Sequence, residues 1–164
     1  MASLTLRNGI INFKKDDDYN TPREVWESIS HLIPKDKMIW ECFYGDGKSG
    51  EYFKELGFNV IHKPVDFFED PNFDYDILIS NPPYSIKAKV FKRLSEIDKQ
   101  FMMLVPVSTM TKQYLKTYFK DKIQIIIPKK RIQFIKNGHQ TSRCWFDTIF
   151  ITYKMNLEND IIFL

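Results

Sequence analysis

In Asp74-Tyr75-Asp76-Ile77-Leu78-Ile79-Ser80-Asn81-Pro82-Pro83-Tyr84, a run of aliphatic residues is followed at once by an asparagine and two prolines. The run predicts a strand, and the strand must end there, because proline lacks the backbone donor of a sheet and restricts the residue before it. Asn81 is therefore expected at the carboxyl end of a strand, where open α/β sheets bind their ligands. Its amide oxygen, the stiff carbonyl of Pro82 and the ring of Tyr84 suit a planar, amino-bearing group.

Strand and helix patterns alternate along the rest of the chain. Predicted helices span residues 21–31, 48–56, 87–97 and 109–119, the first with Thr21 as N-cap and Pro22 at the first helical position. Predicted strands span residues 38–43, 58–62, 74–80, 101–107, 123–127 and 145–153, with a further short run at 65–68. This alternation predicts an α/β fold with a mostly parallel sheet and helices on both faces.

The length of 164 residues fits one domain, which would bury about two thirds of its unfolded surface. We find no internal repeat and no linker. Residues 1–18 are read as an N-terminal extension and residues 155–164 as a short tail. No segment remains for a separate target-recognition domain.

The composition argues against a membrane protein, a disulfide-stabilised protein and a zinc protein. The longest apolar runs are far too short to cross a bilayer, and no signal peptide opens the sequence. Two cysteines and three scattered histidines give neither a disulfide framework nor zinc spacing. We expect a metal-free protein in the cytoplasm or another reducing compartment inside the cell.

Charge is distributed unevenly along the chain. Residues 1–81 carry 9 Lys and Arg against 15 Asp and Glu, a net charge of −6, whereas residues 82–164 carry 15 against 6, a net charge of +9. A basic half that begins beside a planar-group site favours a polyanion such as nucleic acid, although such residues also solvate helix faces and loops. The expected phosphate contacts are Lys87, Lys89, Lys92, Arg93, Lys129, Lys130, Arg131, Lys136 and Arg143.

A glycine-rich turn follows the first predicted strand, at Glu41-Cys42-Phe43-Tyr44-Gly45-Asp46-Gly47. In this architecture the turn between a strand and a helix is where nucleotide-type ligands bind. Its glycines permit tight turning and close approach of a ligand, and Glu41 can accept a hydrogen bond. Gly47-Lys48-Ser49 looks like the end of a phosphate-binding loop, but that loop needs a glycine where this chain has Cys42. The turn also favours a binding site at Asn81 over a mere strand-terminating turn.

Four motifs follow one another along the chain: Thr21-Pro22, Glu41-x-Phe43-x-Gly45-x-Gly47, Asp66-Phe67 and Asn81-Pro82-Pro83-Tyr84. In this order they resemble the S-adenosylmethionine-dependent amino-methyltransferases of the NPPY type, which modify adenine in DNA or RNA. The resemblance covers nearly the whole chain, from Tyr19 to Tyr153. It implies a single Rossmann-like methyltransferase domain with a seven-stranded, mostly parallel sheet and S-adenosylmethionine as cofactor.

The resemblance also implies roles for individual residues. Tyr19, Thr21 and Pro22 would lie near the methionine end of the cofactor, and the turn residues Glu41, Phe43, Gly45 and Gly47 would lie along its centre. Asp66 and Phe67 would bind the adenine of the cofactor, since an acidic oxygen suits the amino group and a ring suits the adenine face. Asn81 would lie between cofactor and substrate. The implied cofactor residues are Tyr19, Thr21, Pro22, Glu41, Phe43, Gly45, Gly47, Asp66, Phe67 and Asn81.

One departure from the family concerns the end of the second strand, which reads Val60-Ile61-His62-Lys63. The family usually places an acid there to bind the ribose hydroxyls, and a lysine cannot accept a hydrogen bond. Either His62 takes over this role or the ribose is held less tightly. The helix that normally follows the second strand is also expected to be missing.

The implied catalytic residues are Asn81, Pro82 and Tyr84. The amide oxygen of Asn81 and the carbonyl of Pro82 would accept hydrogen bonds from the exocyclic amine of adenine, which positions its lone pair for an in-line displacement. Tyr84 would stack on a base flipped out of its duplex or taken from a single strand. Phe134 resembles a second contact to that base, and core packing is the alternative for it.

Three alternatives to an adenine methyltransferase acting on DNA stay open. The substrate can be adenine in RNA, or a glutamine side chain in a protein, because a carboxamide is also planar and amino-bearing. A non-catalytic subunit that binds nucleic acid for an active partner is the third. With no separate recognition domain, a second copy or a partner subunit is expected to contribute target recognition if the loops do not.

Overall fold

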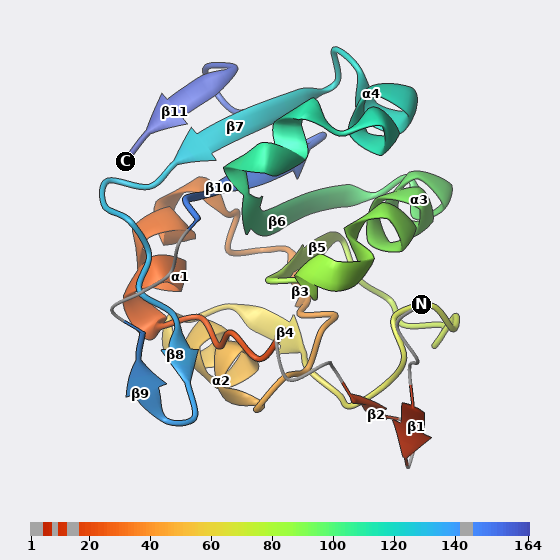
Figure 1. The fold of residues 1–164 in the computed structure, drawn as a ribbon, viewed down its shortest axis with the longest axis vertical. Coiled ribbons are helices and arrows are strands. Elements are labelled where there is room, and N and C mark those ends of the chain that lie inside the picture. Colours follow the sequence, from red (N-terminus) through yellow and green to blue (C-terminus); the bar gives the residue numbers. More distant parts are fainter. Residues whose placement is uncertain (1–4, 8–9, 13–16, 142–145) are drawn as a thin grey trace.

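The structure is a computed structural model that describes residues 5–7, 10–12, 17–141 and 146–164, with side chains described from residue 17 onward. Within these residues, seven strands form one sheet in the order β11-β7-β10-β6-β5-β3-β4 (Figure 1). β10 runs antiparallel to β6 and β7, and the other pairings are parallel. The strands are β3 Met38–Trp40, β4 Asn59–Ile61, β5 Ile77–Ser80, β6 Gln100–Pro106, β7 Ile123–Ile127, β10 Thr148–Tyr153 and β11 Ile161–Phe163.

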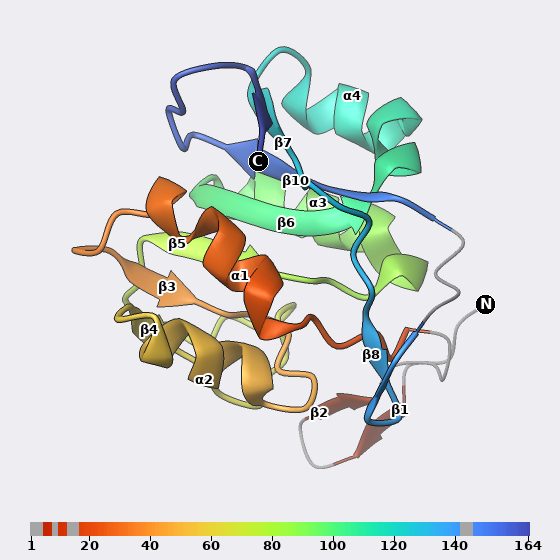
Figure 2. The ribbon, with the colours of Figure 1, turned by 90° about the vertical axis from the view of Figure 1, so that its left-hand side faces the viewer.

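Helices cover both faces of this sheet. α1 (Arg23–Ile29) and α2 (Lys48–Glu55) lie on one face, and α3 (Lys87–Ile97) and α4 (Gln113–Phe119) lie on the other (Figure 2). The predicted fold class is therefore confirmed, and it is the arrangement that the resemblance implies for a Rossmann-like methyltransferase domain. No helix among the described residues is long and apolar enough to span a membrane.

The central strand β5 explains why the sheet needs two helical layers. All four of its residues are buried, and successive side chains point to opposite faces. Ile77 and Ile79 pack into the core on the side of α1 and α2, with Trp26 and Phe53. Leu78 packs into the core on the side of α3 and α4. A strand that is buried on both faces reads as a continuous apolar run, which is the pattern that predicted it.

The seventh strand differs from the prediction. The run at 65–68 is not a strand, and the expected tail, residues 155–164, contains β11, which pairs in parallel with β7 at the edge of the sheet. The amide nitrogen of Gln124 donates to the carbonyls of Leu157 and Asn159, and its amide oxygen accepts from the Leu157 N–H. This side chain holds the turn that returns the chain to the sheet edge, a contact between positions more than 30 residues apart.

The helix predicted at 87–97 and the strand predicted at 123–127 are confirmed with the same bounds. The helix predicted at 109–119 is instead a 3-10 turn, Val107–Thr111, followed by α4 after an extended residue at Lys112. α1 begins at Arg23 with Pro22 as its N-cap, so the prediction of Thr21 as a capping residue is wrong. α1 is followed by the 3-10 turn Ser30–Leu32.

Two hairpins stand outside the main sheet. The N-terminal extension contains the antiparallel pair β1 (Thr5–Arg7) and β2 (Ile10–Asn12). The connection between β7 and β10 contains the antiparallel pair β8 (Ile135–Lys136) and β9 (His139–Gln140). The two residues of the turn between β8 and β9, Asn137 and Gly138, both have positive φ, as this kind of two-residue hairpin turn requires.

Candidate active site at the carboxyl ends of β3 and β5

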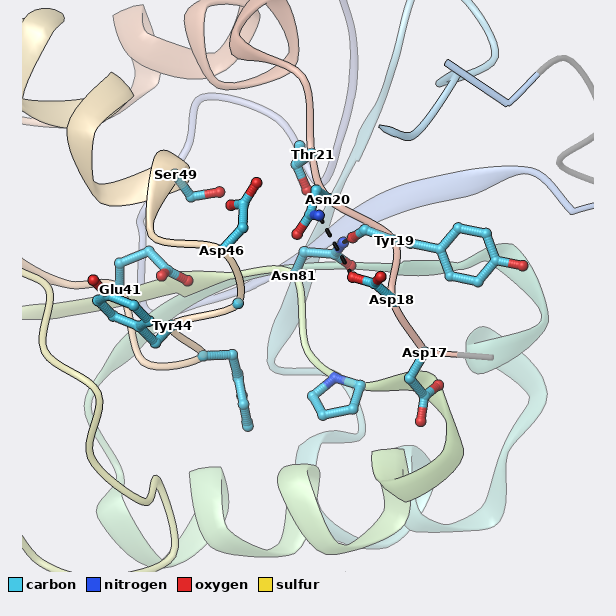
Figure 3. Close-up of a pocket in the computed structure, with 13 residues that line it drawn as sticks. Asp17, Asp18, Tyr19, Asn20, Thr21, Glu41, Tyr44, Asp46, Ser49 and Asn81 are labelled. Atoms are coloured by element: carbon cyan, nitrogen blue, oxygen red, sulfur yellow. Dashed lines mark hydrogen bonds between the residues drawn. The ribbon is translucent and has the colours of Figure 1, made fainter. Parts of the chain in front are cut away.

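The chain reverses its direction of travel across the sheet at β3. From β3 it passes to β4 on one side, and then to β5 on the other side. Such a switch point leaves a crevice at the carboxyl ends of the two strands. A small, partly enclosed pocket lies there. Residues 17–21, the turn after β3, and Asn81 and Pro83 after β5 line it (Figure 3).

The pocket brings together part of the set of residues that the sequence predicted. Pro22, Gly47, Asp66 and Phe67 do not line it. The two glycines of the turn adopt positive φ, +57° at Gly45 and +86° at Gly47, so the predicted tight turn is confirmed. The predicted residues that do line the pocket are Tyr19, Thr21, Glu41, Phe43, Gly45 and Asn81.

Asn81 has an amide that is fixed on one side and unpaired on the other. Its Nδ2 donates a hydrogen bond of 2.8 Å to the backbone carbonyl of Tyr19. This bond fixes which end of the amide carries the oxygen. Oδ1 is buried and has no hydrogen-bond partner among the described residues. Because burying an unpaired acceptor costs about 1–3 kcal/mol, this oxygen is suited to a donor that a ligand supplies.

Glu41 is buried beneath the pocket and is held by two neighbours. Its carboxylate accepts a hydrogen bond from the Ser80 hydroxyl. On the other side, Nε2 of His62 lies 2.8 Å from its second oxygen, with both side chains at most 4% exposed. Tyr44 stacks on the imidazole, with ring centroids 4.4 Å apart. Glu41 therefore lines the pocket and is also the centre of a buried polar chain.

At the end of β4, His62 and not Lys63 contacts the glycine-rich turn after β3. Lys63 is exposed, with its ammonium 5.4 Å from the centroid of the Phe73 ring. Residues 62–76 contain no helix, so the predicted loss of the helix after the second strand is confirmed.

Gly50 makes room for the His62 ring. A Cβ atom at this position in α2 would overlap the imidazole. Gly→Ala inside a helix ordinarily stabilises a protein by about 1 kcal/mol, but we expect Gly50→Ala to destabilise this chain by about 1–3 kcal/mol through overpacking. Urea unfolding measures this, with the neighbouring exposed Glu51→Ala as control. A higher unfolding midpoint for Gly50→Ala would show that His62 does not occupy this position.

The pocket lining is acidic. Carboxylates come from Asp17, Asp18, Glu41 and Asp46, and no lysine or arginine lines the pocket among the residues that the structure describes. Asp17 is held in place because its carboxylate accepts hydrogen bonds from the backbone N–H and the hydroxyl of Ser85. An acidic, partly enclosed pocket favours a cationic ligand. Thr21 adds a buried hydroxyl that has no partner within the described part of the chain.

Asp66 and Phe67 stand apart from this pocket. The Phe67 side chain is fully buried and packs against Trp40 and Phe43, so its ring offers no face to a ligand. A carboxylate oxygen of Asp66 accepts a hydrogen bond from the backbone N–H of Phe68. Phe43, by contrast, lines the pocket.

Four aromatic side chains form a cluster next to Asn81, and we call Tyr19, Tyr84, Phe134 and Phe146 the aromatic cluster. Tyr84 begins a 3-10 turn after the two buried prolines, and its ring meets Phe134 and Phe146 edge-on. Phe134 is fully buried, so it supports the cluster from within. Sequence alone left base contact and core packing open for this residue, and the structure places it in the core.

The expected basic residues lie in different settings. Lys89, Lys129 and Lys130 are exposed. Arg131 pairs with Asp147 at 2.7 Å. Lys92 is exposed and Arg93 is half-buried, with an ion pair to Glu96 on α3, and Arg143 lies outside the described residues.

Lys87 borders the NPPY turn at the start of α3. Its ammonium donates a 2.9 Å hydrogen bond to the carbonyl of Tyr84. Burial lowers the pKa of this lysine, and the positive charge of Lys112 lowers it further.

Cys42 is buried beside Glu41, a setting that disfavours the reactive thiolate form. Burial raises its pKa well above the ordinary value, and the charge of Glu41 raises it further, so it stays a thiol. Among the residues that the structure describes, no group of three or more His, Cys, Asp or Glu side chains could hold a metal ion.

Sequence reasoning missed several lining residues. Asp17, Asp18 and Asn20 precede the Thr21-Pro22 motif, and Tyr44, Asp46 and Ser49 lie within or just after the glycine turn. The acidic run before Tyr19 was a usable signal, since acidic residues next to a cofactor motif favour a cationic group. The contact of His62 with Glu41 had no sequence signal, because it depends on how β4 pairs with β3.

No protein-family model matches this chain, and no curated protein matches it. Three solved structures are similar to it in fold. A Listeria monocytogenes protein assigned to the class I S-adenosylmethionine-dependent methyltransferases is 12% identical with a TM-score of 0.46, over 88% of this chain and 64% of that one. Precorrin-6y C5,15-methyltransferase of Geobacter metallireducens is 14% identical with a TM-score of 0.43, over 88% and 100% of the chains.

The third structure is TrmN of Thermus thermophilus, at 14% identity and a TM-score of 0.35, over 79% of this chain and 40% of that one. The chain thus spans less than two thirds of the length of the first and the third of these proteins.

Proposed function

We propose that this chain is an S-adenosylmethionine-dependent methyltransferase that transfers a methyl group to the exocyclic amino group of adenine in DNA. The observation that carries the proposal is the Asn81 amide, whose oxygen is buried and unpaired within the described residues while its nitrogen is fixed by the Tyr19 carbonyl. It lies at the carboxyl end of the central strand, beside the pocket at the switch point. An oxygen held in this way selects a ligand with an N–H donor.

The residues of the pocket fit the cofactor. S-Adenosylmethionine carries a sulfonium and an ammonium group, and the described lining residues supply four carboxylates and no basic side chain. The unpaired hydroxyl of Thr21 would hold the carboxylate of the methionine part. Gly45 lets the backbone approach the ligand closely. When bound there, the cofactor supplies an electrophilic methyl group.

Asn81 acts on the amine that receives the methyl group. The lone pair of an exocyclic amine is delocalised into the adenine ring, which makes the nitrogen a poor nucleophile. Asn81 Oδ1 and the carbonyl of Pro82 would accept its two N–H bonds, draw the nitrogen toward a tetrahedral geometry and aim its lone pair. This is catalysis by positioning and preorganised electrostatics, with no covalent enzyme intermediate. The proton that the product nitrogen loses passes to water.

Charge supports a nucleic acid as the second substrate. The pocket is acidic, while residues 82–164 carry a net charge of +9, so a cationic cofactor and a polyanion are attracted to different parts of the molecule. Lys129 and Lys130 are exposed and follow the carboxyl end of β7. β7 and β5 run in the same direction, so these lysines and Asn81 lie on the same side of the sheet, where both strands end. The NPPY motif and the order of the motifs favour adenine in DNA among the nucleic acids.

The test offers radiolabelled S-adenosylmethionine to duplex DNA, single-stranded DNA, RNA and a protein extract side by side. We expect the label in DNA. Label only in protein would move the assignment to a glutamine side chain, and label only in RNA would move it to RNA adenine. No label in any polymer, from protein that binds the cofactor, would contradict an enzymatic role.

The lysines after β7 are expected to contribute to DNA affinity through phosphate contacts. Lys129→Gln with Lys130→Gln should weaken DNA binding and reduce the slope of log K against log salt by about 1–2, since each lost contact removes about one unit. The matched control is Lys120→Gln with Lys122→Gln, which removes the same charge from the opposite end of β7. Titrations at several salt concentrations measure both variants. Equal slopes for the two pairs would show that Lys129 and Lys130 do not contact DNA.

A further inference from the structure

Tyr19 lines the pocket, and its ring extends from there to the side of Asn81 that faces away from Glu41. Figure 3 shows it pointing away from Glu41 and Tyr44, on the far side of the Asn81 amide. The resemblance placed Tyr19 at the methionine end of the cofactor. The backbone of Tyr19 does border the pocket, but its ring extends beyond it.

The Tyr19 ring belongs to the aromatic cluster around the NPPY motif. It lies nearly parallel to the Tyr84 ring, with centroids 6.4 Å apart and 20° between planes. It meets Phe134 and Phe146 edge-on, each at 5.7 Å. Phe134 is fully buried, whereas Tyr19 and Tyr84 are only partly buried. The two tyrosines are thus the members that combine aromatic faces of similar orientation with access to a ligand.

The backbone on both sides fixes the position of this ring. The Tyr19 carbonyl accepts the hydrogen bond from Asn81 Nδ2. The next residue, Asn20, exchanges two backbone hydrogen bonds of 2.9 and 2.8 Å with Ile135 of β8. The ammonium of Lys136, also in β8, lies 4.8 Å from the centroid of the Tyr19 ring. One segment therefore links the Asn81 amide, the aromatic cluster and Lys136 of the β8–β9 hairpin.

We propose that Tyr19 is a substrate-base contact: its ring, together with that of Tyr84, stacks on the base whose amine Asn81 holds, and Lys136 beside it attracts the phosphate of the same nucleotide. Stacking of a base on an aromatic ring contributes affinity with little sequence preference, and a cation over the ring face adds to it. The inference rests on the proposed function and names the residues that recognise its nucleic-acid substrate.

The test separates base binding from cofactor binding. A fluorescent 12-nucleotide single strand with one adenine is compared with the same strand carrying an abasic site at that position. We expect Tyr19→Leu to reduce the adenine-dependent gain in affinity at least about fivefold, and Tyr19→Phe to retain most of it. Calorimetric affinity for S-adenosylmethionine should be unchanged in both variants. Tyr118→Leu, on α4, is the control for losing a half-buried tyrosine.

Three outcomes would overturn the inference. The first is a loss of cofactor affinity in Tyr19→Leu while the adenine-dependent gain stays intact. The second is that Tyr118→Leu loses as much of the adenine-dependent gain as Tyr19→Leu does. The third is a wild-type protein that shows no adenine-dependent gain. Methyl transfer is measured separately. If Tyr19→Leu loses the adenine-dependent gain but wild type labels no polymer, the base contact stands and the proposed reaction fails. If Tyr19→Leu methylates DNA with unchanged KM, the base contact fails and the reaction stands.

Discussion

Asn81→Ala is expected to lower methyl transfer at least about 10³-fold, which in practice means below detection. The substitution removes the oxygen that would accept the substrate N–H, and the hydroxyl of the neighbouring Ser80 is already bonded to Glu41. Transfer of label from S-adenosylmethionine to DNA measures the loss. Cofactor affinity should change much less, because most of the pocket lining comes from residues 17–21 and the turn after β3.

The same variant is expected to fold at least as well as wild type. Alanine removes one hydrogen bond, that of Nδ2 to the Tyr19 carbonyl, worth about 1 kcal/mol, but it also removes a buried acceptor that had no partner among the described residues. The two effects nearly cancel, so the melting temperature should stay the same or rise, as it does where an active site is built at the expense of stability. Asn59→Ala, an exposed amide on β4, is the control. Full activity in Asn81→Ala would contradict the mechanism, and a collapse of stability would make Asn81 structural.

Glu41→Ala is expected to cost about 2–5 kcal/mol of unfolding free energy. Glu41 is 1% exposed, and its two oxygens face Ser80 and His62. Removing it leaves two buried polar groups without their partner, each costing about 1–3 kcal/mol. Glu41→Gln keeps the shape and one oxygen acceptor, so its cost should be about half or less. Chemical denaturation at neutral pH measures both variants.

The exposed Glu51→Ala on α2 is the control for losing a carboxylate. If Glu41→Ala unfolds at the same denaturant concentration as this control, the buried polar chain contributes nothing to stability. In that case the role of Glu41 would lie in ligand binding alone.

The sequence predicted those parts of the fold that local pattern determines. The predicted bounds of the strand at 123–127 and of the helix at 87–97 match the observed ones. A short continuous apolar run indicates a buried strand, and apolar residues at helical spacing indicate a helix. β11 was missed because the apolar run that contains Ile161-Ile162-Phe163 is short and lies at an exposed sheet edge, with Ile161 55% and Phe163 76% exposed, so its pairing with β7 is not evident from local pattern. Its pairing depends on the side chain of Gln124, far away in sequence.

The sequence predicted those parts of the candidate site in which a motif marks the end of a strand or a tight turn. Asn81 and the two glycines belong to this class, since prolines and positive φ leave clear marks in a sequence. The pairing of Glu41 with His62 and the direction of the Tyr19 ring depend on tertiary packing. They could not be read from spacing, and here the family pattern pointed to different contacts.

The most direct test of the central claim identifies the methylated atom. DNA incubated with the protein and S-adenosylmethionine is digested to nucleosides, which are separated and analysed by mass spectrometry. An Asn81 oxygen that accepts the N–H of an exocyclic amine predicts a methyl group on the exocyclic nitrogen of adenine, and its absence from DNA treated with Asn81→Ala. A methyl group on a ring nitrogen or a carbon atom, or the same product from Asn81→Ala, would contradict it.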